Sequence, residues 1–162
     1  MNTEQARISL KRRASDTANP VGEPAMQIDY DYLKRLMEAF TEAPRPTTDI
    51  VELQKLGLDY ETDIFVFHMQ ILQDQGFIVQ PDGDTDIGLQ YGIGADEPSW
   101  GAVPLRLTAA GHEFLDGLRS KQAMAVIKSS AKSVSISTAK TIFKAVLEES
   151  TKAAAKAFLS AQ

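Results

Sequence analysis

The chain has 162 residues, with 17 Lys and Arg, 22 Asp and Glu, a formal net charge of −5 and no cysteine. Apolar residues make up 43% and charged residues 24%, which is ordinary globular usage and excludes a wholly disordered or collagen-like chain. Without cysteine, disulfides and thiolate metal sites are excluded, and we expect a reducing, cytoplasmic setting. No apolar run approaches the roughly 20 residues that span a bilayer, and no secretory signal is recognisable. We therefore expect one domain with appendages.

Charge is distributed unevenly along the chain. Residues 61–100 contain eight acids and no Lys or Arg, whereas residues 101–162 contain nine cations and four acids. The molecule therefore combines an acidic middle with a basic C-terminal third, and this asymmetry bears on which partners it can attract.

The first half of the chain predicts an arm followed by three helices. Residues 1–25 are polar and lack helical periodicity, which predicts a flexible N-terminal arm. Apolar residues then recur at helical spacing until Pro44, and two further helical segments are followed by Gly57 and Gly76. The expected helices cover about 28–43, 49–56 and 60–75.

The second half predicts short strands and then more helices. Strands are expected over 77–80, 86–92 and 103–107, with Pro104 placing the last at a sheet edge and a loop over 94–101. Helices are expected from a Thr108 cap to about 118, over about 121–132, and from Ser135 or Ser137 to about 160. The predicted fold is mainly α with a small β-wing: a winged helix-turn-helix over 26–120, followed by a C-terminal helical extension over 121–162.

The third predicted helix is where a winged helix-turn-helix would read DNA. At about 100° per residue, its core side contains Ile64, Phe65, Phe67, His68, Ile71 and Leu72. We expect the opposite side to form an interaction face made of Thr62, Val66, Met69, Gln70 and Gln73. This helix has no cation, and an acidic turn (PDGDTD) follows it. Because phosphate neutralisation supplies much of the affinity for DNA, we favour a protein partner for this face.

The two histidines invite a metal hypothesis, but a buried structural role is favoured. Zinc needs three or four ligands, and the chain has only two histidines and no cysteine. We expect neither a metal nor another cofactor, and we expect His68 to bond to Glu113 or Asp116 in the core. The motif expected to be buried consists of His68, Gly111, His112, Glu113 and Asp116. No nucleophile arrangement and no phosphate-binding glycine loop is present, so we expect no catalytic residues and no enzyme activity.

The last predicted helix carries a lysine stripe on one side and an apolar stripe on the other. Such a helix can dock on its own domain, pair with a second copy or lie on an anionic surface. The residues expected to mediate self-association are Ile142, Phe143, Val146, Leu147 and Phe158. Phosphate contacts, if the chain binds DNA, would come from the cations Lys11, Arg12, Arg13, Lys140 and Lys144.

Two segments resemble a bacterial and phage family catalogued as domain of unknown function 2513. Residues 68–78 (HMQILQDQGFI) and residues 106–116 (RLTAAGHEFLD) carry the resemblance, and GHEFLD is the more specific part. The resemblance covers about 26–145. It implies a winged-helix-like fold and says little about activity.

Two functional hypotheses follow from the sequence. The preferred one is a non-enzymatic regulatory or interaction protein with a degenerate winged helix, which contacts a protein partner or forms a homodimer. The alternative is a winged-helix transcriptional regulator of bacterial or phage origin that binds DNA. A nucleic-acid partner is disfavoured because the predicted recognition helix lacks positive charge.

Overall fold

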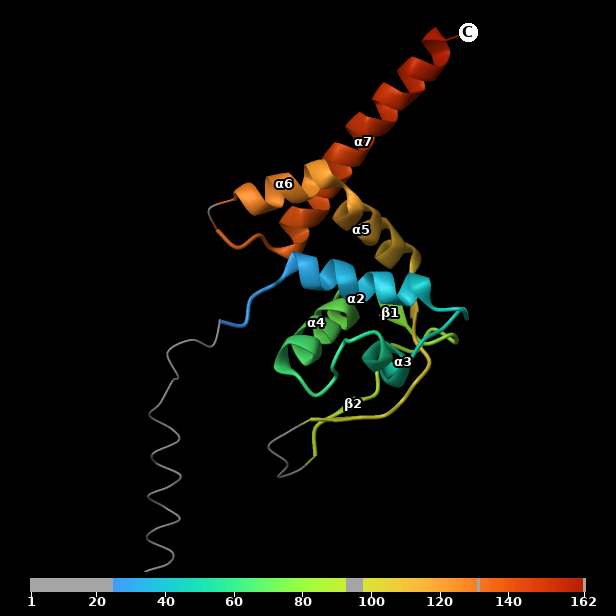
Figure 1. The fold of residues 1–162 in the computed structure, drawn as a ribbon, viewed down its shortest axis with the longest axis vertical. Coiled ribbons are helices and arrows are strands. Elements are labelled where there is room, and N and C mark those ends of the chain that lie inside the picture. The colour runs from blue at the N-terminus through green and yellow to red at the C-terminus, as the bar shows by residue number, and fades with distance from the viewer. Residues whose placement is uncertain (1–24, 93–97, 131, 162) are drawn as a thin grey trace, which may run out of the picture.

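The computed structural model describes residues 25–92, 98–130 and 132–161. The predicted N-terminal arm lies almost wholly outside these residues, as do its cations Lys11, Arg12 and Arg13. The fold is mainly helical, with two small antiparallel strand pairs. Figure 1 shows the helices gathered into a body from which the last helix extends.

The first helix, α2, spans Tyr30–Glu42. It begins at Asp29, whose carboxylate accepts the backbone N–H of Tyr32, an N-cap that satisfies one of the helix's free donors. Its buried side includes Leu33, Leu36 and Met37, which have no exposed surface. The helix ends before Pro44, as predicted.

Helices α3 (Ile50–Lys55) and α4 (Asp63–Asp74) follow, each with a side-chain cap. The Asp49 carboxylate accepts the N–H groups of Val51 and Glu52, and the Thr62 hydroxyl accepts the N–H of Phe65. Both segments lead into a glycine at positive φ, Gly57 at 78° and Gly76 at 64°. A side chain would be strained in that conformation, which is why glycine ends the helical segments here.

The strands are shorter than the sequence predicts. β1 (Ile78–Val79) pairs antiparallel with β4 (Arg106–Leu107), and β2 (Leu89–Gln90) pairs with β3 (Ser99–Trp100). The segment expected to be a loop therefore contains β3. The predicted edge position of the 103–107 strand is wrong, because Leu105 bridges to Thr48 on one side while the next two residues pair with β1 on the other. Pro104 lies just outside this pairing.

Three helices complete the fold: α5 (Ala109–Arg119), α6 (Lys121–Ser129) and α7 (Ile136–Ser160). The hydroxyls of Thr108, Ser120 and Ser135 cap them in turn. The buried apolar residues form one cluster that runs from Tyr30 to Phe143. The core therefore crosses the expected boundary at residue 120, and the first part of α7 belongs to the body.

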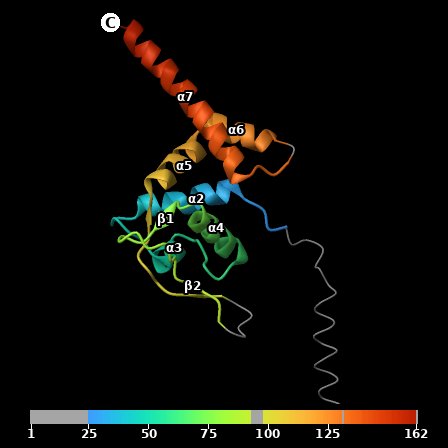
Figure 2. The same ribbon diagram turned by 180° about the vertical axis from the view of Figure 1, so that it is seen from behind.

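The second half of α7 lies away from the body. Figures 1 and 2 show it extending beyond α5 and α6 in opposite views, with no other described element beside it. Every described residue from 148 to 161 is exposed. Among the described helices, none combines the length and the apolar character that a bilayer crossing requires.

Candidate interaction surfaces

The predicted interaction face of α4 is covered by the rest of the chain. Met69 is fully buried and Val66 is only 9% exposed, so their predicted outward position is wrong. The Gln70 side chain donates to the Tyr91 hydroxyl at 3.0 Å, and the Gln73 side chain donates to the Thr85 carbonyl at 2.9 Å. The segment after β1 thus folds back over this side of the helix.

The surface that α4 presents instead is apolar in the middle and acidic at both ends. Ile64 is exposed and Phe67 and Ile71 are half-buried, while Asp63 and Asp74 are exposed. Thr62, the remaining member of the predicted face, serves as the N-cap. Within the described part of the chain, the only hydrogen bond from a cation to residues 62–75 comes from Lys140 to Gln75.

The acidic turn after β1 is held together by its own carboxylates. Asp82 accepts the N–H of Asp84 at 3.0 Å, Asp84 accepts that of Asp86 at 2.9 Å, and Asp86 accepts that of Gly88 at 2.8 Å. These are local side-chain-to-backbone bonds of the kind that favours turns. All three aspartates are exposed, so this turn presents negative charge beside α4.

His68 is completely buried and joins α4 to the start of α2. Its Nε2 accepts the backbone N–H of Asp29 at 2.9 Å, and its Nδ1 lies 2.7 Å from the carbonyl oxygen of Ile64. Because a backbone N–H can only donate and a carbonyl can only accept, the ring is neutral with its proton on Nδ1. Burial lowers the pKa of His68, against the opposing influence of the Ile64 hydrogen bond and of Asp29.

This arrangement makes stability depend on pH. A histidine whose pKa is lowered by folding stabilises the folded state above its unfolded pKa of about 6.5 and loses that contribution as pH falls below it. We expect the free energy of unfolding to be flat from pH 8 to 7 and then to fall between pH 6.5 and 5. The limiting slope is about 1.4 kcal/mol per pH unit. Urea unfolding across this range measures it.

A matched pair of variants isolates the effect. His112→Gln, at an exposed histidine, should keep the wild-type profile, whereas His68→Gln should flatten it. If His68→Gln does not fold, an NMR titration of the wild-type ring supplies the same answer. A His68 ring that titrates at or above the ordinary value would contradict the prediction.

The rest of the predicted buried motif is divided between core and surface. Gly111 is buried against the backbone of Phe77, but His112, Glu113 and Asp116 are exposed, so their predicted burial is wrong. The cause is the phase of α5, which turns Phe114 and Leu115 inward instead. The expected bond from His68 to Glu113 or Asp116 is also wrong, since His68 bonds to the backbone. Across the described ranges, no three His, Asp or Glu side chains converge on a common point.

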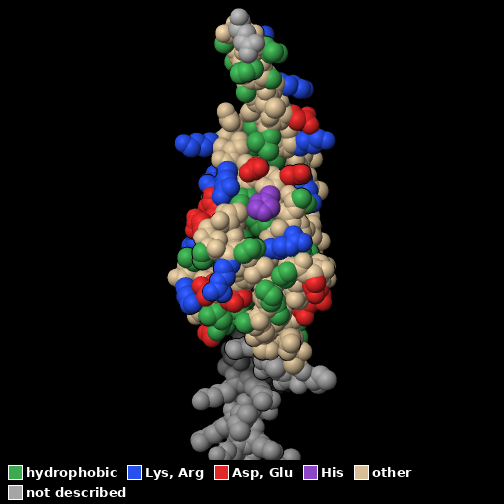
Figure 3. All heavy atoms as spheres, turned by 90° about the vertical axis from the view of Figure 1, so that its right-hand side faces the viewer, with side chains coloured by type: hydrophobic (Ala, Val, Ile, Leu, Met, Phe, Trp, Pro, Cys, Tyr) green, Lys and Arg blue, Asp and Glu red, His purple; other side chains and the backbone are tan. Residues whose placement is uncertain are grey.

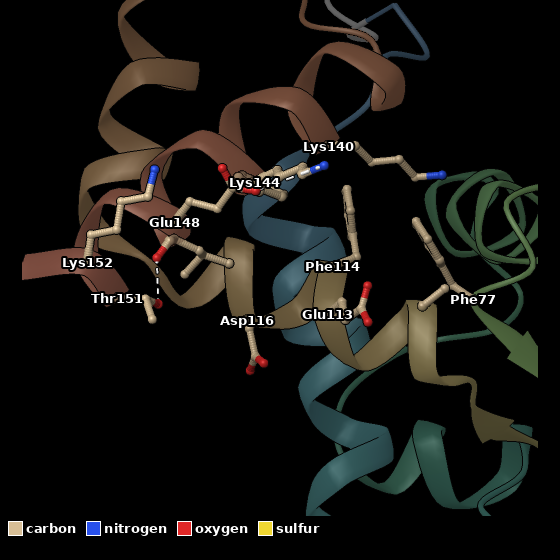
Figure 4. Close-up of a pocket in the computed structure, with 12 residues that line it drawn as sticks. Phe77, Glu113, Phe114, Asp116, Lys140, Lys144, Glu148, Thr151 and Lys152 are labelled. Atoms are coloured by element: carbon tan, nitrogen blue, oxygen red, sulfur yellow. Dashed lines mark hydrogen bonds and ion pairs between the residues drawn. The ribbon is translucent and has the colours of Figure 1, made fainter. Parts of the chain in front are cut away.

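A groove of about 760 Å³ lies between α5 and α7. Its floor is aromatic: Phe77 and Phe114 stack with ring centroids 4.6 Å apart, and Phe143 lies 5.1 Å from Phe114. Lys140 spans one end, with its Nζ 4.9 Å from the centre of the Phe77 ring and 2.8 Å from the Gln75 side-chain oxygen. Figure 4 shows Phe77 and Phe114 side by side under Lys140.

The two walls of the groove carry different charges. Glu113 and Asp116 stand on α5, and the α7 wall carries Lys140, Lys144, Glu148 and Lys152. Lys144 lies 3.9 Å from Glu148, an exposed contact that contributes little stability. Within the described residues, neither Glu113 nor Asp116 has an ion-pair partner.

The predicted self-association residues of α7 are not equivalent. Phe143 is 3% exposed and belongs to the core, so its predicted outward role is wrong. Gly117 of α5 explains this: a Cβ there would lie 2.2 Å from the Phe143 ring, so the glycine makes room for it. Ile142, Val146 and Leu147 are half-buried, and Phe158 is 67% exposed.

Sequence reasoning missed the groove as a site. Its aromatic floor is assembled from three segments far apart in the chain, and no local spacing signals that they meet. The one available signal was Gly111 and Gly117, two glycines in a helical pattern, which indicate close approach of a neighbour.

Comparison with known proteins adds no relative. No family model, no curated protein and no solved structure matches the chain.

Proposed function

We propose that the chain is a non-enzymatic interaction protein whose body is a degenerate winged helix and which assembles with a second copy through α7. The observation that carries the proposal is the second half of α7, a helical segment exposed on every side whose apolar stripe has no partner among the described residues.

The winged-helix assignment is supported by the order of the elements. The order along the chain is a helix, a short bridge at Thr48, two helices and an antiparallel strand pair. The strand at 105–107 lies between Thr48 and β1. This order, with two helices joined by a turn and followed by a β-ribbon, is typical of a winged helix-turn-helix. We call it degenerate because the outward side of α4, its recognition-helix equivalent, is apolar with acidic ends.

The α7 proposal follows from the exposed position of the second half of this helix. Residues 148–160 would extend about 20 Å from the body at 1.5 Å per residue. Because α7 is already nucleated where its base packs on the body, this segment needs no nucleus of its own, and packing of its apolar stripe would add further stability. Positions that continue the core side of α7 are apolar or small: Leu147, Ser150, Ala154, Ala157 and Phe158. Small residues allow two helices to approach closely, so burial of this stripe against another helix would stabilise it.

The mass of the protein in solution tests this proposal. We expect sedimentation equilibrium to give twice the 17.7 kDa chain mass. Phe158→Asp should give the single-chain mass, because a carboxylate would be buried in the interface. Ala145→Asp is the matched control: it adds the same charge on the opposite side of α7 and should remain dimeric. The measurement is made at about 100 micromolar, on the order of the dissociation constant of a weak dimer. If the wild-type protein has the single-chain mass at that concentration, the proposal is overturned.

The DNA-binding alternative is less well supported by the geometry. α4 carries no cation, and Asp63, Asp74 and the aspartates of the turn place negative charge where a duplex would lie. On the face drawn in Figure 3, basic and acidic side chains are interspersed. A phosphate backbone is held by clustered Lys and Arg, so we expect no mobility shift of duplex DNA even at low salt. A shift that weakens steeply with added salt would favour the alternative.

A further inference from the structure

The outward side of α4 lies beside the point where the described chain begins. We propose that residues 7–13 of the same chain (RISLKRR) dock along this side as an extended segment. In this contact, the apolar side chains of the segment meet the apolar middle of α4, and its cations lie beside the acidic ends. The contact is made within one chain and does not depend on the dimer proposed through α7.

The outward side of α4 consists of Asp63, Ile64, Phe67, Ile71 and Asp74, which recur at helical spacing. Ile64 is 36% exposed, and the half-buried Phe67 ring lies edge-on to the His68 ring at 5.1 Å. Within the described ranges, neither Asp63 nor Asp74 has an ion-pair partner. This side therefore offers apolar area to bury together with two carboxylates that an occupant can neutralise.

Negative charge dominates the surroundings of this side. Residues 61–92 contain six acids and no Lys or Arg. Lys128 lies near Ile64, but its Nζ is 2.9 Å from the Asp31 carboxylate. Lys140, at the other end of α4, bonds to the Gln75 side chain. A cationic occupant is therefore favoured, and a phosphate backbone or an acidic peptide would be repelled.

The N-terminal arm supplies a segment of the opposite charge. Residues 7–13 contain four cations and no acid, and they include the only run of three consecutive Lys or Arg in the chain. Ile8 and Leu10 alternate with polar residues, so an extended segment would present both of them on one side. The segment thus combines the apolar and cationic groups that the outward side of α4 lacks.

The arm is attached within reach of this surface. A hollow of about 430 Å³ is lined by Ala25, Ile28 and Ile64, so the described chain begins beside the N-terminal end of α4. Residues 14–24 can span at most about 36–40 Å, whereas the 12 residues of α4 extend for only about 18 Å. Because the segment is tethered, its effective concentration at α4 exceeds that of a separate basic partner.

The charges of the two partners are spaced alike. Arg7 and Arg12 are about 17 Å apart in an extended chain, and Asp63 and Asp74 are about 16 Å apart along a helix. Since the tether arrives near Asp63, the segment would run antiparallel to α4. This direction places Arg12 beside Asp63 and Arg7 beside Asp74.

The apolar side chains fall into the same register. Ile8 and Leu10 are about 7 Å apart in an extended chain, and Phe67 and Ile71 are about 6 Å apart along the helix. With the charges paired in the antiparallel direction, Leu10 lies over Phe67 and Ile8 over Ile71. One placement of the segment therefore satisfies both the charged and the apolar contacts.

A nitroxide label on the arm tests the docking in the full-length protein. Because the chain has no cysteine, Ser9→Cys carries a single label, and Ser9 alternates with the docking residues, so the label points away from α4. In the NMR spectrum, we expect the amide signals of residues 63–74 to lose intensity, compared with the reduced label, and those of residues 148–160 to keep it. Isotope-enriched chains without a label, mixed with labelled chains of natural abundance, should show no such loss.

A charge exchange tests the pairing. Arg7→Glu with Arg12→Glu should lower the docking equilibrium constant roughly tenfold, since two exposed ion pairs are replaced by repulsion. Asp63→Lys with Asp74→Lys should lower it similarly, with circular dichroism confirming that the helices remain. The chain with all four changes should regain the signal loss, because each pair is restored with its signs reversed.

A matched control changes the net charge equally outside this surface. Lys121→Glu with Lys132→Glu, at two exposed side chains, should leave the signal loss unchanged. Loss confined to α4 that disappears with either charge pair and returns with the fourfold exchange supports the inference. Three results overturn it: intensity that is even over the whole body, loss that survives charge reversal, or loss that appears in the mixed sample, which would place the arm on a second copy.

Discussion

Replacing Phe143 by alanine is expected to lower the free energy of unfolding by about 3–5 kcal/mol, the usual cost of removing a buried aromatic ring. The ring is 3% exposed, lies against Phe114 and fills the space that Gly117 leaves on α5. Its loss leaves a cavity between α5 and α7 and frees the base of α7 from the body. Urea or guanidinium unfolding followed by circular dichroism measures the change.

An apolar side chain on the exposed part of the same helix is the control for this variant. Leu159 is 74% exposed and lies on the outer side of α7, away from the stripe, so Leu159→Ala should change the free energy of unfolding by no more than about 0.5 kcal/mol. Both measurements belong in the Phe158→Asp background, so that dissociation of a dimer does not add to unfolding. Equal losses for the two variants would show that Phe143 is not a core residue.

Gly111→Ala is expected to lower the free energy of unfolding by about 1–3 kcal/mol, although helix propensity alone predicts a gain of about 1 kcal/mol. A Cβ at this position would lie 2.3 Å from the carbonyl oxygen of Phe77. That oxygen also accepts the backbone N–H of Thr108 at 2.9 Å, so it is held in place where α5 begins beside β1. The steric clash lowers the free energy of unfolding and the helix propensity of alanine raises it. A urea denaturation curve of the variant shows which of the two is larger.

The neighbouring alanine calibrates the propensity contribution. Ala110 is exposed on the same turn, and Ala110→Gly should cost about the propensity difference of 1 kcal/mol at most. If Gly111→Ala raised the stability by a similar amount, the close approach of α5 to β1 would be contradicted.

The helices and their ends were largely predictable because their causes are local. The cap at Thr108 and the stop at Pro44 depend on residues within one turn of the boundary. The cap at Ser135 is of the same kind, and the structure selects it over Ser137. The strands were harder to place, because pairs of only two residues are defined by partners distant in the chain.

The orientation of α4 shows where local reasoning failed. Apolar residues occur on nearly every side of this helix (DIFVFHMQILQD), so its periodicity did not single out one buried face. The choice was made by packing: α2 lies over His68, and the segment leading to Tyr91 covers Gln70 and Gln73. Val66 and Met69 became buried as a result, and the predicted face does not exist.

Local chemistry in the chain was therefore enough to specify most helices, their caps, the acidic turn and the helical class of the protein, because each depends on residues a few positions apart. Which sides of those helices face water was decided by long-range packing, since burial depends on what lies opposite. The aromatic groove shows the difference most clearly: Phe77, Phe114 and Phe143 acquire a common surface only when β1, α5 and α7 come together around two glycines.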